Sequence, residues 1–143
     1  MPLIWKGAEY LEGLEKRTYN RLQTASGFLA NQIKLKLSMG QPPGPAGGPP
    51  HVLSGMLRNS IDYQMVDGET SRVGVQVGPA NKYALIHELG GDIFPKRAKA
   101  LRFKTADGKW HTVKHVRIPS RPYLRPALDE NFQQLEKIIA GKE

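Results

Sequence analysis

Apolar residues recur every three or four positions near both ends of the chain, and this spacing is typical of amphipathic helices. The first pattern runs from Leu11 to Ile33 and predicts one long N-terminal helix within residues 1–39. Roughly thirty helical residues extend about 45 Å, longer than a domain of this size can cover. We therefore expect part of this helix to meet a neighbouring subunit. The second pattern runs from Leu124 to Ile139 and predicts a closing helix.

Between the two helices, apolar residues alternate with polar ones, as in half-buried strands. One hairpin is expected over residues 61–77 and a second over 100–118, each with an Asp-Gly turn in its middle. Short helices are expected at residues 55–60, capped by Ser54, and at residues 83–89. This order predicts an α+β fold, with an antiparallel sheet of about four strands packed by the two terminal helices.

A Pro/Gly-rich loop follows the first helix, with five prolines and three glycines in residues 41–50. It fits neither a helix nor a central strand. A flexible linker is one interpretation, but the preceding helix is too simple to fold alone, so we favour an extended arm that reaches a partner. We expect a single domain over 1–143, divided into the helix (1–39), the loop (40–52), short helices and two hairpins (53–118), and a proline strap with the closing helix (119–143).

The strap has the sequence IPSRPYLRPAL over residues 118–128, in which three prolines alternate with two arginines. Each proline fixes φ near about −65°, so the strap enters a contact with little chain entropy left to lose. The arginines offer forked donors, and Tyr123 and Leu124 offer apolar anchors. This chemistry predicts docking to a partner. The same residues also fit an ordinary strand-to-helix connection with Pro126 in the first helical turn.

The net charge of +8 is concentrated in one segment, since residues 96–125 hold ten basic residues and one acidic residue, Asp107. Such a field attracts a polyanion or an acidic protein face, although a solubilising hairpin is an alternative. The basic surface that we expect to face DNA or an acidic partner comprises Lys96, Arg97, Lys99, Arg102, Lys104, Lys109, Lys114 and Arg117.

The sequence contains no complete motif that would indicate catalysis. His87-Glu88 begins like a zinc-protease motif, but Gly91 stands where the second histidine is needed. His111 and His115 would lie about 13 Å apart on one strand face, too far to share a metal ion. The chain has no cysteine, no Gly-x-Ser-x-Gly elbow and no phosphate loop or dinucleotide fingerprint. We therefore predict no enzymatic activity, no metal and no cofactor.

No apolar run approaches the length of roughly 18 residues that a membrane span needs, and the first residues lack a signal-peptide core. We therefore expect a soluble protein, made inside the cell, with no membrane contact.

Four features in order carry a resemblance over nearly the whole chain. They are the long first helix, PPHVLSGMLRNSI (49–61), YALIHELGG (83–91) and IPSRPYLRPALDEN (118–131). Together they resemble the small neck or tail-completion proteins of long-tailed bacteriophages, including the virion morphogenesis proteins of Mu-like phages. The resemblance implies a non-enzymatic structural protein of the virion, assembled in the host cytoplasm, at the junction between head and tail.

The resemblance further implies a ring of six identical subunits around a DNA channel. Neighbouring neck, tail-terminator or tail-tube proteins, and packaged DNA through non-specific contact, would be its partners. The residues expected to dock onto another subunit or partner are Arg58, Glu88, Arg121, Pro122, Tyr123, Leu124, Arg125 and Pro126. The competing hypothesis is a basic nucleic-acid-binding module without enzymatic activity, which would use Phe103, Trp110 and Tyr123 as aromatics between the cations.

Overall fold

The computed structural model describes residues 6–40, 47–50, 54–67, 73–79, 83–105 and 107–142, and it confirms the α+β class. Most of the predicted Pro/Gly-rich loop lies outside these residues. The elements in chain order are α1 (Gly7–Ser38), α2 (Met56–Asn59), β1 (Ile61–Asp67), β2 (Val73–Pro79), α3 (Ala84–Leu89), β3 (Gly91–Ile93), β4 (Leu101–Lys104), β5 (Trp110–Val113), β6 (Val116–Ile118) and α4 (Leu124–Ala140).

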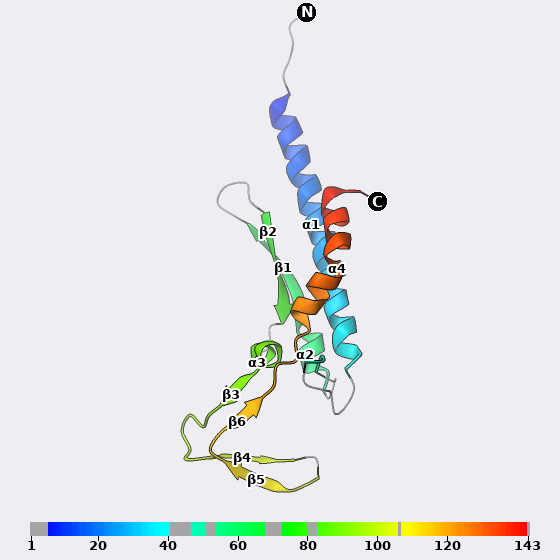
Figure 1. Cartoon of the computed structure of the whole chain (residues 1–143). Helices are drawn as coiled ribbons and strands as arrows, with labels where there is room; N and C mark the ends of the chain where they lie inside the picture. Colours follow the sequence, from blue (N-terminus) through cyan, green and yellow to red (C-terminus); the bar gives the residue numbers. More distant parts are fainter. Residues whose placement is uncertain are drawn as a thin grey trace, which may run out of the picture.

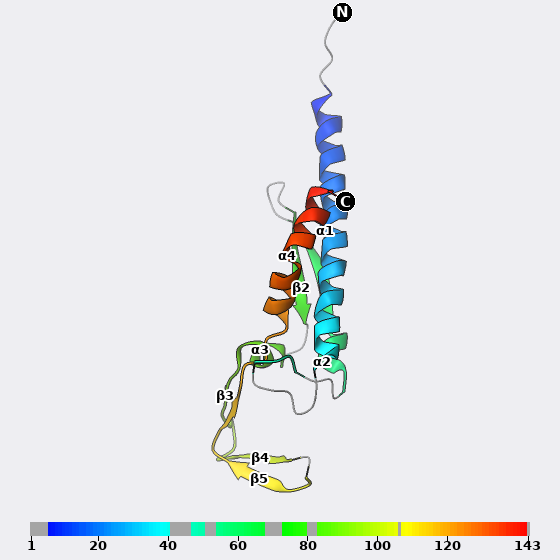
Figure 2. The same cartoon turned by 45° about the vertical axis from the view of Figure 1, so that its right-hand side comes forward.

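The predicted first helix is present as α1, whose 32 residues extend about 48 Å. Its C-terminal half packs against both α4 and the β1–β2 hairpin, and α4 runs antiparallel to it (Figure 1). Near the end of α4, Arg21 donates a hydrogen bond to the Ala140 carbonyl at 3.3 Å. Residues 8–20 continue beyond this point with almost every side chain exposed, and both views show them clear of the other elements (Figures 1 and 2). We call residues 8–20 the α1 overhang.

The core lies where α1, β1 and the start of α4 meet. Its buried members are Ala30, Ile33, Leu37, Ile61, Tyr123 and Ala127, and Leu29, Leu57, Tyr63 and Leu124 pack against them. Full burial of a side chain such as Ile33 stabilises the fold by roughly 1.5–3 kcal/mol. An ion pair between Lys36 and Glu130 fastens α1 to α4 at the edge of this core.

The strands form three separate antiparallel pairs, β1–β2, β3–β6 and β4–β5, in place of the predicted sheet of about four strands. The first predicted hairpin is confirmed, with Ile61 opposite Pro79 and Asp67 opposite Val73. The second is shorter than predicted, because β5 ends at Val113 and β6 pairs with β3, which the pattern did not predict. Strand β3 has only three residues and begins with a glycine, so its apolar and polar residues alternate too briefly for the strand to be recognised from the sequence. These two pairs project away from the helices (Figure 1).

The N-terminal cap of the first short helix, α2, differs from the predicted one. Ser54 accepts a hydrogen bond from the Met56 N–H at 3.4 Å, but Gly55 occupies the N-cap position with a left-handed φ of 74°. Helix α2 therefore begins at Met56 and has only four residues. None of the helices in the described part of the chain is long and apolar enough to cross a membrane.

Candidate functional site

Two of the sequence motifs, residues 83–91 and 118–131, meet through the side chain of Glu88. Its carboxylate accepts three successive backbone N–H groups, from Tyr123 at 2.8 Å and from Leu124 and Arg125 at 3.0 Å each. The first N–H groups of a helix have no acceptor within the helix. Pro126, the next residue, has no N–H to satisfy. One carboxylate from α3 therefore caps the start of α4 and places its negative charge at the positive end of the helix dipole.

The strap follows the surface of α3 before it reaches this cap. The Arg121 N–H donates to the His87 carbonyl at 2.7 Å, and the Ser120 carbonyl accepts the Gly47 N–H at 3.1 Å. Gly90 has a left-handed φ of 71°, and a Cβ there would lie 2.6 Å from the Ser120 nitrogen. Such a distance does not occur between real Cβ atoms and backbone, so only glycine permits the strap to lie this close to α3.

Tyr123 requires a correction of the predicted docking surface. Its side chain is 0% exposed and belongs to the core, so it is not available as an anchor for a partner. Its hydroxyl donates to the Ala84 carbonyl at 3.5 Å. Burial, with a smaller effect of the Glu88 charge, raises the pKa of Tyr123 to about 12. The strap turns into α4 directly over the core, and this turn points the ring inward.

The other predicted docking residues are distributed over the strap and α2. Arg58 donates to the Ser38 hydroxyl at 3.2 Å and joins α2 to the end of α1. Arg125 is exposed and lies 4.0 Å from Asp129. The partly buried residues of the set are Arg121, Pro122, Leu124 and Pro126. Pro126 is the third residue of α4, so the strap is the strand-to-helix connection that the sequence left as an alternative. Contact of these residues with a partner stays a prediction.

Two groups of exposed apolar side chains lie on the helices. The α1 overhang carries Tyr10, Leu11 and Leu14, which are 61%, 58% and 43% exposed. On α4, the exposed residues are Leu128, Phe132 and Ile139, which we call the α4 stripe. The sequence pattern alone did not distinguish the α4 stripe from the rest of the apolar face of this helix. The stripe could have been predicted from the width of the apolar arc on α4, because that arc is wider than the contact of α4 with the core requires.

The register of the β4–β5 hairpin gives it two chemically different faces. Leu101 lies opposite Val113 and Phe103 opposite His111, and these four residues form an apolar face. The other face, which we call the cationic face, carries Arg102, Lys104, Trp110 and Thr112. An aromatic contact lies on each face. The Phe103 and His111 rings stack with their centroids 5.9 Å apart, and the Arg102 guanidinium lies 4.7 Å from the Trp110 ring centroid.

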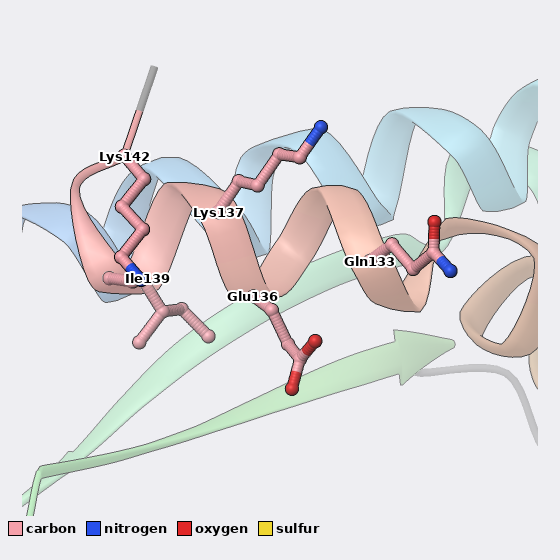
Figure 3. Close-up of a pocket in the computed structure, with 6 residues that line it drawn as sticks. Gln133, Glu136, Lys137, Ile139 and Lys142 are labelled. Atoms are coloured by element: carbon pink, nitrogen blue, oxygen red, sulfur yellow. The ribbon is translucent and has the colours of Figure 1, made fainter.

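An open groove of about 680 Å³ runs along the C-terminal part of α4. Its described lining is Gln133, Glu136, Lys137, Ile139, Ala140 and Lys142, whose side chains project from this end of the chain (Figure 3). The lining offers a single carboxylate and two amines, without a nucleophile or a histidine to act as a base. Across the described residues, no group of three or more His, Cys, Asp or Glu side chains lies close enough to hold a metal ion.

His87 lies beside the strap, and its Nδ1 atom is buried without a hydrogen-bond partner among the described residues. Burial lowers the pKa of His87, and the charge of Arg121 lowers it further. The neutral imidazole is therefore the form that fits the folded subunit.

Comparison with known proteins identifies the family of the chain. No curated protein and no solved structure matches it significantly. The sequence profile of the phage virion morphogenesis family matches residues 50–141. This match covers more than half of the chain, from just before α2 through α4, and includes both halves of the Glu88 cap. The chain therefore belongs to the phage virion morphogenesis family and is a structural protein of a phage virion.

Proposed function

We propose that this chain is a ring-forming subunit of the head–tail neck, acting as a tail-completion or head–tail joining protein. The supporting observation is the exposed apolar surface of its helices. The side chains of Tyr10, Leu11 and Leu14 on the α1 overhang and of Leu128, Phe132 and Ile139 on the α4 stripe are all exposed in the described subunit. Contiguous exposed apolar patches mark sites of protein–protein contact. Each member of a closed ring has two neighbours and hence two interfaces.

The two apolar groups on the helices supply the two sides of this interface. In the proposed ring, the α1 overhang of one subunit packs on the α4 stripe of the next. The two surfaces differ, so the contact is head-to-tail, and a head-to-tail contact forms a ring when its rotation closes. Leu11 and Leu14 are 58% and 43% exposed, so burial of the exposed part of both side chains would contribute roughly 1.5–3 kcal/mol per interface. No other element of the described subunit covers these side chains.

The position at the neck and the ring size of six rest on the resemblance of the motif order to neck and tail-completion proteins. On this proposal the neighbours are other neck proteins, the tail terminator or the tail tube. The order of motifs from residue 49 to residue 131 supports this assignment, and it falls almost entirely within the profile match.

The absence of cysteine permits a direct test of the proposed contact. Leu14→Cys combined with Phe132→Cys should give a ladder of disulfide-linked subunits on mild oxidation, because each cysteine would face its partner on the next subunit. The matched control pairs Leu14→Cys with Met39→Cys, which is 73% exposed at the other end of α1 and should give no ladder. Equal cross-linking in both pairs, or none in either, would refute this interface.

A basic nucleic-acid-binding module without enzymatic activity is the second candidate function. The charge of the β4–β5 hairpin and its flanks favours it. A protein that acts only in this way needs no ring, and its binding would weaken steeply with salt, whereas a ring with apolar interfaces should survive high salt.

A further inference from the structure

The positive charge around the β4–β5 hairpin is not cancelled within the described subunit. Of the eight basic residues from Lys96 to Arg117, only Lys109 forms an ion pair with a described side chain, Asp107, at 3.9 Å. Asp107 also accepts a short hydrogen bond from the Thr105 hydroxyl, which is the main cause of its lowered pKa. The other seven basic residues are exposed, so their field extends into solvent.

Trp110 lies within this field on the cationic face. Its side chain is 60% exposed, although an indole is among the most favourable side chains to bury. The guanidinium of Arg102 lies 4.7 Å from the ring centroid and fixes the indole through a cation–π contact. Lys104 lies directly opposite Trp110 across the hairpin. An exposed aromatic ring between two cations without ion pairs indicates a ligand that is both anionic and able to stack.

We propose that the cationic face binds the phosphate backbone of duplex DNA. Side chains on one face of a strand repeat about every 6.8 Å, so Arg102 and Lys104 lie side by side on the cationic face. Both long side chains can reach phosphates of one DNA strand, while Trp110 contacts sugars or bases. A two-stranded ribbon is also narrow enough to enter the major groove. This partner assignment rests on the proposed function, which places the chain where DNA passes between head and tail.

An acidic protein face is the competing occupant. It would explain the charges, and Trp110 would then be an apolar anchor of the interface and not a ring that stacks on a base. Backbone contacts carry no sequence information, so the binding should be non-specific. Its signature is therefore the salt dependence of affinity, to which each phosphate contact contributes a slope of about 0.9.

The test measures binding of the full chain to a fluorescent duplex of about 30 base pairs over a series of salt concentrations. Arg102→Gln with Lys104→Gln should lower the slope by about 1.8 and weaken binding roughly 60-fold at 0.1 M salt. The matched control, Lys16→Gln with Lys142→Gln, removes the same charge from exposed helical and C-terminal positions and should change affinity less than threefold. In a Trp5→Phe background, the only remaining tryptophan is Trp110, and its emission should be quenched by DNA.

Absence of duplex binding at low salt, or equal losses in the hairpin variant and the control, would overturn the proposal. Binding of polyglutamate as tightly as DNA, without a change in Trp110 emission, would also overturn it, in favour of an acidic protein partner. The mass of each sample is measured in parallel. If the chain is a monomer and binds DNA through the hairpin, the proposed ring is refuted but this inference is not. If the chain forms a ring and does not bind DNA, this inference is refuted but the ring is not.

Discussion

The carboxylate of Glu88 lies 2.8 Å from the backbone nitrogen of Tyr123, across 35 positions of the chain. Through this contact, α3 holds the first turn of α4, and the same turn places the Tyr123 ring in the core. The packing of α3 against the start of α4 thus depends on Glu88, a side chain that the sequence suggested for contact with a partner. Loss of this carboxylate should weaken the subunit itself.

Glu88→Ala leaves three N–H groups at the start of α4 without an acceptor. We expect a loss of about 2–3 kcal/mol in the free energy of unfolding, since three charge-assisted bonds exceed a single ordinary cap. Urea unfolding followed by circular dichroism measures this loss. Glu88→Gln keeps an acceptor oxygen and should lose less. The control is Glu136→Ala on the exposed side of α4, and an equal effect of both alanine variants would contradict the cap.

Tyr123→Ala should destabilise the subunit by about 3–5 kcal/mol, because it empties a fully buried site in the core. Tyr123→Phe loses only the 3.5 Å bond to Ala84 and should cost about 1 kcal/mol or less. Unfolding curves of the two variants separate these contributions. A folded, fully stable Tyr123→Ala subunit that fails only in assembly would restore the docking role predicted for this residue.

Gly90→Ala and Gly13→Ala should have opposite effects on stability. At Gly90 the added Cβ meets the Ser120 nitrogen at 2.6 Å in a left-handed backbone, so we expect a loss of at least about 2 kcal/mol. At Gly13, in α1, nothing lies within 4 Å, so alanine should stabilise the helix by up to about 1 kcal/mol. Melting temperatures of both variants test the pair, and a harmless Gly90→Ala would contradict the close approach of the strap.

His87 should make the subunit less stable in mild acid. Burial and Arg121 hold the pKa of His87 below its ordinary value of 6.5. Between the folded-state pKa and 6.5, the unfolded chain binds more protons, so stability is lost as the pH falls through this window. His87→Gln removes the titrating group, and its free energy of unfolding should vary less between pH 7.5 and 5.5. The same pH dependence in both proteins would contradict this assignment.

The elements with the strongest periodicity could be predicted from sequence. Residues 11–33 and 124–139 repeat at helical spacing over several turns, and residues 61–77 alternate around an Asp-Gly turn, so α1, α4 and the first hairpin follow from local pattern. The pairing of β3 with β6 joins residues about 25 positions apart through three-residue strands, so no local pattern marks it.

The Glu88 cap could not be predicted from the sequence for a related reason. Periodicity identifies faces of helices and strands, but it does not show which acceptor satisfies the N–H groups of a helix start 35 positions away. The strap also misled the prediction for Tyr123, because prolines and arginines around it are typical of surface segments. The charged segment was found correctly from composition, whereas its division into two faces required the register of β4 and β5.

The mass of the purified chain in solution tests the central claim, assembly through the α1 overhang, most directly. The wild-type chain should form a closed oligomer in low and high salt, at about 95 kDa for six copies of 15.9 kDa. Leu11→Gln with Leu14→Gln should give a monomer that keeps the wild-type circular dichroism spectrum, because both side chains are exposed in the isolated subunit. A wild-type chain that stays monomeric in all conditions, including with its neck partners, or a variant that assembles normally, would contradict the account.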